Sequence, residues 1–335
     1  MTPFLPGLFE GSGCLGAQRS GIKEESEGRG TAAELSAPAA RSVDRRAQKH
    51  PPSQKYTCHM SWHAQLQLDY RLEAGKTVAR HSHKGPLRIL QSLYPEGDAI
   101  CHNVLVHPPG GLVGGDTLDL EIVAESGTHG LITTPGATRF YRSAGEPAVQ
   151  RTRITLTGHS RLEWLPLEAI CYNQCLAENL LTLELDAHAE FMGWDVTALG
   201  LPLAAQPFET GSLLQHIEVP GVWLEHGRID AQDLRLLDGP AGMAGQRCLA
   251  TLFFVAGSKI ERARREQALE MARTVIAEHP LRQLAGATSP DGQVIVVRAI
   301  APVVEPAMDL LRQVWATWRA HFWRLSTQAP RIWST

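Results

Sequence analysis

The chain has 335 residues, of which 43% are hydrophobic, and a formal net charge of −3. This composition is typical of a globular protein with one large domain or two ordinary ones, and the near-neutral charge excludes the basic surface of a nucleic-acid-binding protein. No stretch approaches the roughly 18 apolar residues that span a bilayer, which excludes a membrane protein of the helical kind. The first ten residues lack the pattern of a secretory signal, so we expect a cytoplasmic protein with six free thiols.

Residues 1–59 differ from the rest of the chain. They are rich in Gly, Ala, Ser and Arg and show no sustained apolar period. Such a segment cannot bury enough apolar surface to offset the entropy lost on ordering. We therefore predict that residues 1–59 are a disordered tail, or an extension ahead of a true start at Met60. A structured N-terminal subdomain is the alternative, and the main domain is predicted at residues 60–335.

Residues 60–256 are expected to be rich in β-strands. After Met60, Leu66, Leu68 and Tyr70 alternate with polar residues, as in a half-buried strand. Three similar segments then begin at residues 118, 152 and 181, each with a strand, a short turn and a second strand. Their recurrence of about 30 residues favours stacked repeats, each too small to bury its apolar face alone. An antiparallel sandwich gives strands at similar spacing, but we favour stacked β layers over a closed barrel.

Residues 257–335 have an α/β pattern. A buried strand at residues 251–256 leads to an S-x-x-E capping box, Ser258 to Glu261, which predicts the start of a helix that Pro280 ends. Another strand is predicted at residues 294–299. The apolar face of the first helix is expected to consist of Leu269, Ala272 and Ile276, widened by Ala268, Met271 and Val275.

A second helix is predicted with Pro306 in its first turn. Its apolar stripe contains Leu311, Val314, Trp315, Trp318 and Phe322. The stripe is interpreted as core packing, with a partner-binding face as the alternative, because Trp is favoured at interfaces. Arg312 and Arg319 are expected on the exposed side of this helix.

The segment HPPGGLVGGDTL, residues 107–118, is the most distinctive in the chain. Its four glycines allow positive φ angles and close backbone approach. The spacing does not match G-x-G-x-x-G, and a strand rather than a helix follows, so an anion has no helix N-terminus to bind. The pattern therefore indicates a tight structural turn rather than a nucleotide site.

This segment also resembles HPPGGIVGGD, a hallmark of the urease accessory protein D family, called UreD or UreH. TPGATRFYRS, at residues 134–143, is similar to the second hallmark of that family. Shorter matches follow in the expected order: GPL at 85–87, LYPE at 93–96, LEWLP at 162–166, GWD at 193–195, LG at 199–200 and PRIWST at 330–335. The resemblance covers residues 62–335, and the first 59 residues have no counterpart.

The resemblance implies a mainly β fold, a two-layered, β-helix-like stack with a small C-terminal portion of two helices. It also implies a scaffold that is not an enzyme. Such a protein binds apo-urease together with accessory protein F and the GTPase G, and it assists nickel insertion into the urease active site. No tightly bound cofactor is expected, only nickel in transit, and neither nucleic acid nor membrane is an expected partner.

A route for nickel needs oxygen or imidazole ligands that hold the ion loosely. By their positions in the family motifs, four residues are expected to line an internal passage: Asp116, Thr138, Asp195 and Glu225. An acid in an apolar setting is costly unless it is paired or bound to a metal. The alternative for each acid is a hydrogen-bonded turn or a salt bridge, with Arg139 or Arg142 as partner.

Histidines and cysteines offer a second metal hypothesis. His81 and His83 share one face of an extended segment and could form a ligand set with His63, His102 or His107, although surface histidines are the simpler interpretation. Cys171 and Cys175 belong to no tetrahedral zinc pattern. The loop that contains them, EAICYNQC, departs from the family pattern, so no role is carried over to it.

Two other functions stay open. Asp195 and Glu225 could be the carboxylate pair of a β-helical carbohydrate-active enzyme. An open groove with these carboxyls about 5–9 Å apart would favour that enzyme, whereas a narrow enclosed passage would favour the metal scaffold. The third possibility is an interaction module without a passage, in which the acids are structural.

Overall fold

The computed structural model describes residues 61–334. The predicted N-terminal extension, residues 1–59, lies outside this range, so its disorder and the domain start at Met60 stay predictions. Within the described range the chain is mainly β, as the sequence predicts.

Residues 61–334 form two β-sheets. The seven-stranded sheet has the order β14-β13-β11-β8-β5-β1-β2. Its strands are β1 (His63–Glu73), β2 (Lys76–Lys84), β5 (Thr117–Ala124), β8 (Ala148–Leu156), β11 (Leu176–Leu185), β13 (Ser212–Val219) and β14 (Trp223–Asp230).

The ten-stranded sheet has the order β16-β17-β15-β12-β9-β6-β4-β3, with β7 and β10 attached at the end of β12. Its strands are β3 (Arg88–Ile89), β4 (Ile100–Val106), β6 (His129–Thr133), β7 (Thr138–Phe140), β9 (Arg161–Leu165), β10 (Ala169–Cys171), β12 (Glu190–Leu199), β15 (Cys248–Ala256), β16 (Ala285–Asp291) and β17 (Val294–Ala301).

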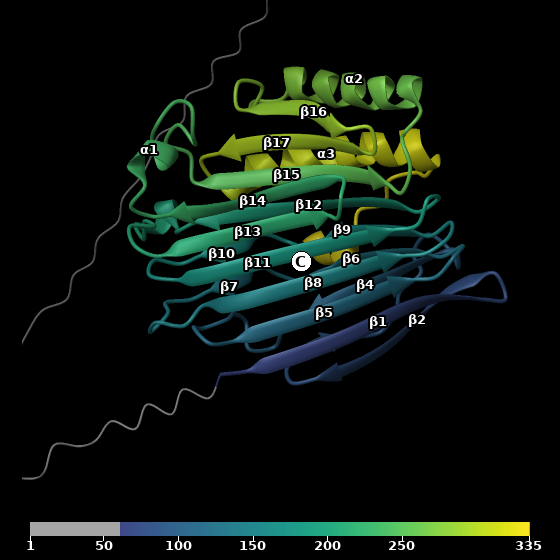
Figure 1. Ribbon diagram of the computed structural model, residues 1–335, viewed down its shortest axis with the longest axis horizontal. Coiled ribbons are helices and arrows are strands. Elements are labelled where there is room, and N and C mark those ends of the chain that lie inside the picture. Colours follow the sequence, from purple (N-terminus) through teal and green to yellow (C-terminus); the bar gives the residue numbers. More distant parts are fainter. Residues whose placement is uncertain (1–60, 335) are drawn as a thin grey trace, which may run out of the picture. The chain divides into compact units, whose positions relative to one another are not determined.

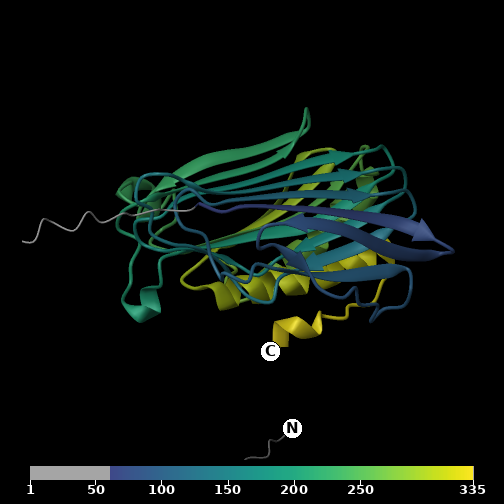
Figure 2. The ribbon, with the colours of Figure 1, turned by 90° about the horizontal axis from the view of Figure 1, so that it is seen from below.

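The chain winds between the two sheets in successive coils. β5 leads to β6, β8 to β9 and β11 to β12, and each strand pairs in parallel with its equivalent in the next coil. These coils are the three similar segments of the sequence, and the whole stack has about four turns. Figure 2 shows the two layers facing each other. The predicted two-layered stack, rather than a closed barrel, is therefore confirmed.

Strand alternation places the core of the stack. Leu118, Leu120 and Ile122 of β5 are buried between the sheets, together with Leu66 and Leu68 of β1. Polar residues between them face outward, because side chains in a strand point alternately to opposite faces. A continuous core thus forms only when coils stack on each other.

The C-terminal part extends the ten-stranded sheet and adds two helices beside it. After β12, the chain adds β15, β17 and β16 in antiparallel pairing. Helices α2 (Arg262–Glu278) and α3 (Val304–Trp323) lie beside these strands, as Figure 1 shows, and pack against each other. The short helices are α1 (Leu234–Leu237), η1 (Pro202–Ala204) and η2 (Arg331–Ser334). The two predicted C-terminal helices are confirmed.

Two details of the predicted helices are wrong. Helix α2 begins at Arg262, and the residue that caps it is Glu261, whose carboxylate accepts the amide hydrogens of Ala263 and Arg264. Ser258 therefore lies outside the helix, and no capping box forms. A Glu side chain can cap the first turn itself, because it is an anion at the positive end of the helix dipole. Met271, expected on the apolar face of α2, is exposed.

The aromatic stripe of α3 is core. Trp315 and Trp318 are buried against the ten-stranded sheet and α2, which confirms core packing over a partner-binding face. The expectation that Arg319 is exposed is wrong, because its side chain is 0% exposed. Arg319 follows Trp315 by four residues, so it lies on the same face of the helix. Arg312 is half-buried, with its guanidinium over the Trp333 ring.

None of the helices within residues 61–334 combines the length and apolar content needed to cross a bilayer.

Candidate functional site

The glycine-rich segment is a tight turn built around Asp116. One carboxylate oxygen of Asp116 accepts the Trp62 amide at 2.8 Å, and the other accepts the Val113 amide at 2.9 Å. At Gly111 a Cβ atom would lie 2.3 Å from the Tyr141 ring, so only glycine fits there. These contacts are those of a hydrogen-bonded turn, one of the two alternatives for this acid.

A column of amide side chains runs through the interior of the stack. Gln150 of β8, Asn179 of β11 and Gln215 of β13 occupy equivalent positions in successive coils of the seven-stranded sheet. The Gln150 amide donates to the Asn179 carbonyl oxygen at 3.4 Å. The register of parallel strands stacks equivalent residues, so one polar position per coil becomes a polar column.

Asp195 faces this column from β12 of the opposite sheet. Its carboxylate accepts hydrogen bonds from Asn179 at 2.7 Å, Gln215 at 2.6 Å and the Thr197 hydroxyl at 3.2 Å. Burial raises the pKa of Asp195 to about 6, and the charge of Glu225 adds to the effect, although the three donors oppose it. The pKa of this carboxyl therefore lies close to neutral pH.

Two adjoining cavities lie along this region. The larger, of about 230 Å³, is lined by Thr138 and Gln150, with His107 at one side. The smaller, of about 30 Å³, is lined by Thr138, Gln150, Asn179 and Asp195. Because Thr138 and Gln150 line both cavities, the two adjoin. Thus the structure brings Thr138 and Asp195 together.

Glu225 and Asp116 line neither cavity, but each lies near a residue that does. Glu225, on β14, forms an ion pair with Arg298, but it lies close enough to raise the pKa of Asp195. Burial lowers the pKa of His107, which lines the larger cavity, and the nearby charge of Asp116 opposes that shift. No ion pair within residues 61–334 joins Arg139 or Arg142 to the predicted acids.

The carboxylate-pair hypothesis for a carbohydrate-active enzyme needs an open groove. The cavity at Asp195 has room for a water molecule or an ion but not for a sugar ring. Glu225 is also committed to Arg298. The two carboxyls therefore do not share an open groove, which counts against the enzyme.

No group of three or more His, Cys, Asp or Glu side chains in residues 61–334 is arranged to hold a metal ion. His81 and His83 do share a face, with ring centroids 6.1 Å apart. Their expected partners are engaged elsewhere, His63 with Asp119 and His102 with Glu96. The cysteines within this range are buried free thiols: Cys101, Cys171, Cys175 and Cys248.

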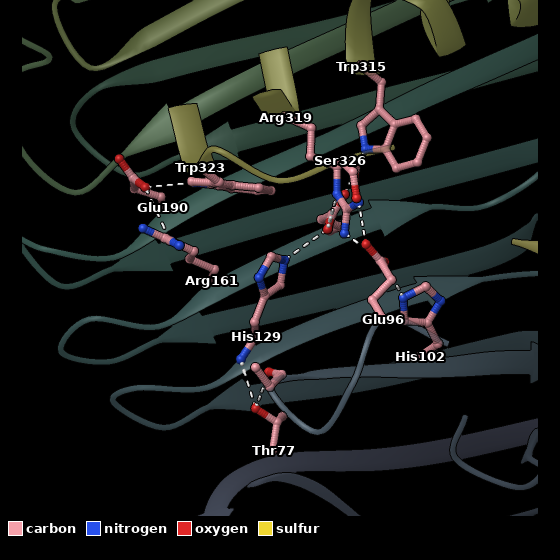
Figure 3. A network of polar contacts seen from close by, with 12 residues as sticks. Thr77, Glu96, His102, His129, Arg161, Glu190, Trp315, Arg319, Trp323 and Ser326 are labelled. Carbon is pink, nitrogen blue, oxygen red and sulfur yellow. Dashed lines mark hydrogen bonds and ion pairs between the residues drawn. The ribbon is translucent and has the colours of Figure 1, made fainter. Parts of the chain in front are cut away.

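A buried ion network, which the sequence alone did not reveal, joins helix α3 to the sheet (Figure 3). Glu163 of β9 is 0% exposed. Its carboxylate accepts hydrogen bonds from His129 at 2.8 Å, Trp315 at 2.7 Å and Arg319 at 3.1 Å. Burial alone would raise the pKa of Glu163, but the bond from His129 and the nearby positive charges lower it below its usual value.

Arg319 also reaches Glu96 through two hydrogen bonds, at 2.6 and 2.8 Å, and donates to the Ser326 carbonyl oxygen. His102 contacts the same carboxylate at 2.8 Å. Burial raises the pKa of Glu96, but the bonds from His102 and Arg319 outweigh that effect and hold it at about 2. A glutamate inside the apolar run LEWLP was the one sequence signal of this network.

Several of the distinctive sequence motifs meet at this network. Glu96 belongs to LYPE and Glu163 to LEWLP. Trp333, from PRIWST, packs against Trp315 and Trp194 and donates to the Thr133 hydroxyl at 2.8 Å. Motifs that lie far apart in the sequence therefore form one buried cluster.

Comparison with known proteins gives a consistent result. A family model described as "UreD urease accessory protein" matches residues 63–334. Relatives called "Urease accessory protein UreD" include one from Polaromonas sp. (strain JS666 / ATCC BAA-500), 70% identical over 275 residues. Another, from Variovorax paradoxus (strain S110), is 68% identical over 276 residues, and one from Methylibium petroleiphilum is 44% identical over 296. Each alignment covers 82% of this chain and 100% of the relative. The chain belongs to the UreD urease accessory protein family.

Proposed function

We propose that the protein is a cytoplasmic scaffold, without catalytic activity of its own, that binds apo-urease together with accessory proteins F and G. In this complex it assists nickel insertion into the urease active site. Nickel is its cargo and not a resident cofactor. Membership of the UreD family supports the urease accessory role.

The observation that carries the nickel route is the polar column between two apolar sheets. A core of this size gains stability from apolar side chains, and each buried polar group must find a partner. Here the amides of Asn179 and Gln215 donate to the single acid Asp195, and the amide of Gln150 donates to Asn179. Such a column gives a hydrated cation oxygen contacts in an otherwise apolar interior.

The composition of the column suits transit rather than storage. Amide oxygens are neutral and weak ligands. An ion moving along the route would meet the carboxylates of Asp195 and Glu225 one after the other. A full cage of imidazoles and carboxylates would trap the ion. We infer a route that passes Asp116 and His107, then Thr138, and then Asp195 and Glu225.

The test is the double variant Asp195→Ala, Glu225→Ala, co-expressed with urease and the other accessory proteins at limiting nickel. We expect pull-down of the complex to be unchanged and the nickel content and activity of urease to fall. Val196→Ala is the matched control, because Val196 adjoins Asp195 but is apolar and buried. It should lower stability without lowering nickel delivery.

Full activation of urease by the double variant would refute the route. Loss of the complex would also count against it, because the acids would then serve folding or docking. Failure of the wild-type chain to co-purify with urease would refute the scaffold function itself.

A further inference from the structure

An imidazole pair lies on the outer face of the seven-stranded sheet. His216 of β13 and His226 of β14 are directly opposite each other in the antiparallel ladder. Their Nδ1 atoms are 3.0 Å apart, and the ring planes meet at 80°. His226 is exposed and His216 is half-buried, so the pair is open to solvent. Neither histidine belongs to the cavities described above.

Glu218 fixes the proton of His216. It lies two residues along the same strand, hence on the same face, and its carboxylate is 3.1 Å from Nε2 of His216. A neutral imidazole carries one proton, and a carboxylate partner keeps it on Nε2. Nδ1 of His216 then carries a lone pair directed at Nδ1 of His226, its hydrogen-bond partner in this structure. A carboxylate that accepts the other ring N–H of a metal-binding histidine orients it in the same way.

The distance between the two nitrogens matches chelation. Nitrogen ligands lie about 2.1 Å from a divalent first-row ion. Two such ligands at the right angle of a square-planar or octahedral ion such as Ni²⁺ are about 3.0 Å apart. The observed separation of 3.0 Å is therefore the span of two adjacent coordination positions. Imidazole is a favoured ligand for Ni²⁺, Zn²⁺ and Cu²⁺.

We propose that His216 and His226 form a two-imidazole site for a divalent transition-metal cation, with Glu218 as the positioning residue. No third ligand from residues 61–334 completes a cage, so water or a partner's side chain fills the other positions. The site lies on the outer face of β14, whereas the neighbouring residue Glu225 is directed the other way, toward Arg298 and Asp195. It is thus separate from the proposed interior route and does not depend on it.

Binding of Ni²⁺ alone, and then Zn²⁺ alone, to the purified full chain tests the site. Equilibrium dialysis gives the stoichiometry, and imidazole ¹⁵N NMR identifies the nitrogens that shift. His216→Gln and His226→Gln should each remove one bound ion per chain or weaken it at least about tenfold. Glu218→Gln should weaken binding of the same ion about tenfold or more. Glu218 orients a ligand and is not itself one.

His159→Gln is the matched control. His159 and His188 are also an exposed imidazole pair, but their rings are stacked with centroids 4.5 Å apart and planes 5° apart. Their lone pairs lie in parallel planes and do not converge on one point, so this variant should bind like the wild type. All measurements are repeated in the Asp195→Ala, Glu225→Ala background, which removes interior binding from the count.

Equal metal binding by the wild type and both histidine variants would overturn the proposal. The contact between the two rings would then be only a hydrogen bond. Equal weakening by His159→Gln would overturn it too, since binding would then follow surface histidines in general. A shift of the His216 and His226 Nδ1 resonances with one equivalent of metal, absent in His226→Gln, is the positive result.

Discussion

Replacement of Arg319 by Met tests the buried ion network most directly. The guanidinium is 0% exposed and lies between the carboxylates of Glu163 and Glu96. Met has a similar stem but no charge, so packing changes little while two carboxylates lose their partner. Breaking a buried ion pair by removing one member costs about 3–5 kcal/mol.

This cost predicts a large fall in thermal stability. For a domain of this size, 1 kcal/mol corresponds to about 2–4 °C in the midpoint, so Arg319→Met should lower it by about 6–20 °C. Scanning calorimetry and urea unfolding measure the change. Adding Glu163→Gln to Arg319→Met should restore part of the loss, because one unpaired charge is then removed.

Arg262→Gln is the matched control, since Arg262 also pairs with a glutamate but at the surface, on α2. Exposed ion pairs contribute little to the free energy of unfolding, so this variant should have the same unfolding midpoint as the wild type. An Arg319→Met variant as stable as Arg262→Gln would refute the view that the network holds α3 to the sheet.

Acid titration checks the same network. The pKa of Glu96 is about 2 rather than 4.5, so the folded state binds this proton more weakly than the unfolded state. The stabilisation is therefore complete above about pH 4.5 and is lost as pH falls toward 2. A shift of this size corresponds to about 3 kcal/mol. In Arg319→Met the acid-dependent loss from Glu96 should be smaller.

Two further outcomes are expected. Burial raises the pKa of Asp195 from 3.8 to about 6, so the folded protein binds this proton more tightly than the unfolded chain does. The free energy of unfolding of the wild type should therefore fall by about 3 kcal/mol as pH rises from 3.8 to about 6. Asp195→Asn should abolish this slope in urea unfolding at pH 4.5 and 7.5; an unchanged slope would contradict the assignment. A Cβ at Gly257 would lie 1.7 Å from the Asp186 carbonyl oxygen, whereas one at Gly286 would meet nothing within 4 Å. Gly257→Ala should therefore lose about 3 kcal/mol or more and Gly286→Ala about 1 kcal/mol or less, and equal midpoints would show that the backbone yields.

Local pattern was enough for the architecture. Strand alternation in the segments after Leu118, Thr152 and Leu181 and their recurrence of about 30 residues predicted stacked coils, because the period of side-chain direction is a local property. The capping box predicts a helix start a few residues before Arg262, where helix α2 begins. Ser258 and Glu261 fit a capping box, but local sequence does not reveal which of two acceptors meets the first amides.

The site residues were predictable only in part. Family motifs indicated Asp195 and Thr138, which line the same cavity. They did not indicate the column formed by Gln150, Asn179 and Gln215, since these amides are ordinary polar residues in their own strands. Only the parallel register stacks them, and a slip of one residue would turn each to the other face.

The sequence by itself determined the mainly β class, the order of strands and the two late helices, and its motifs indicated the UreD family. The tertiary structure alone decided which charged residues are buried. Arg319 has its carboxylate partners 156 and 223 residues away in the chain. The local pattern of apolar and polar residues contains no information about contacts between residues so far apart. A polar residue on an apolar face is costly alone and stable when paired, so its burial is settled only when the coils and α3 have come together.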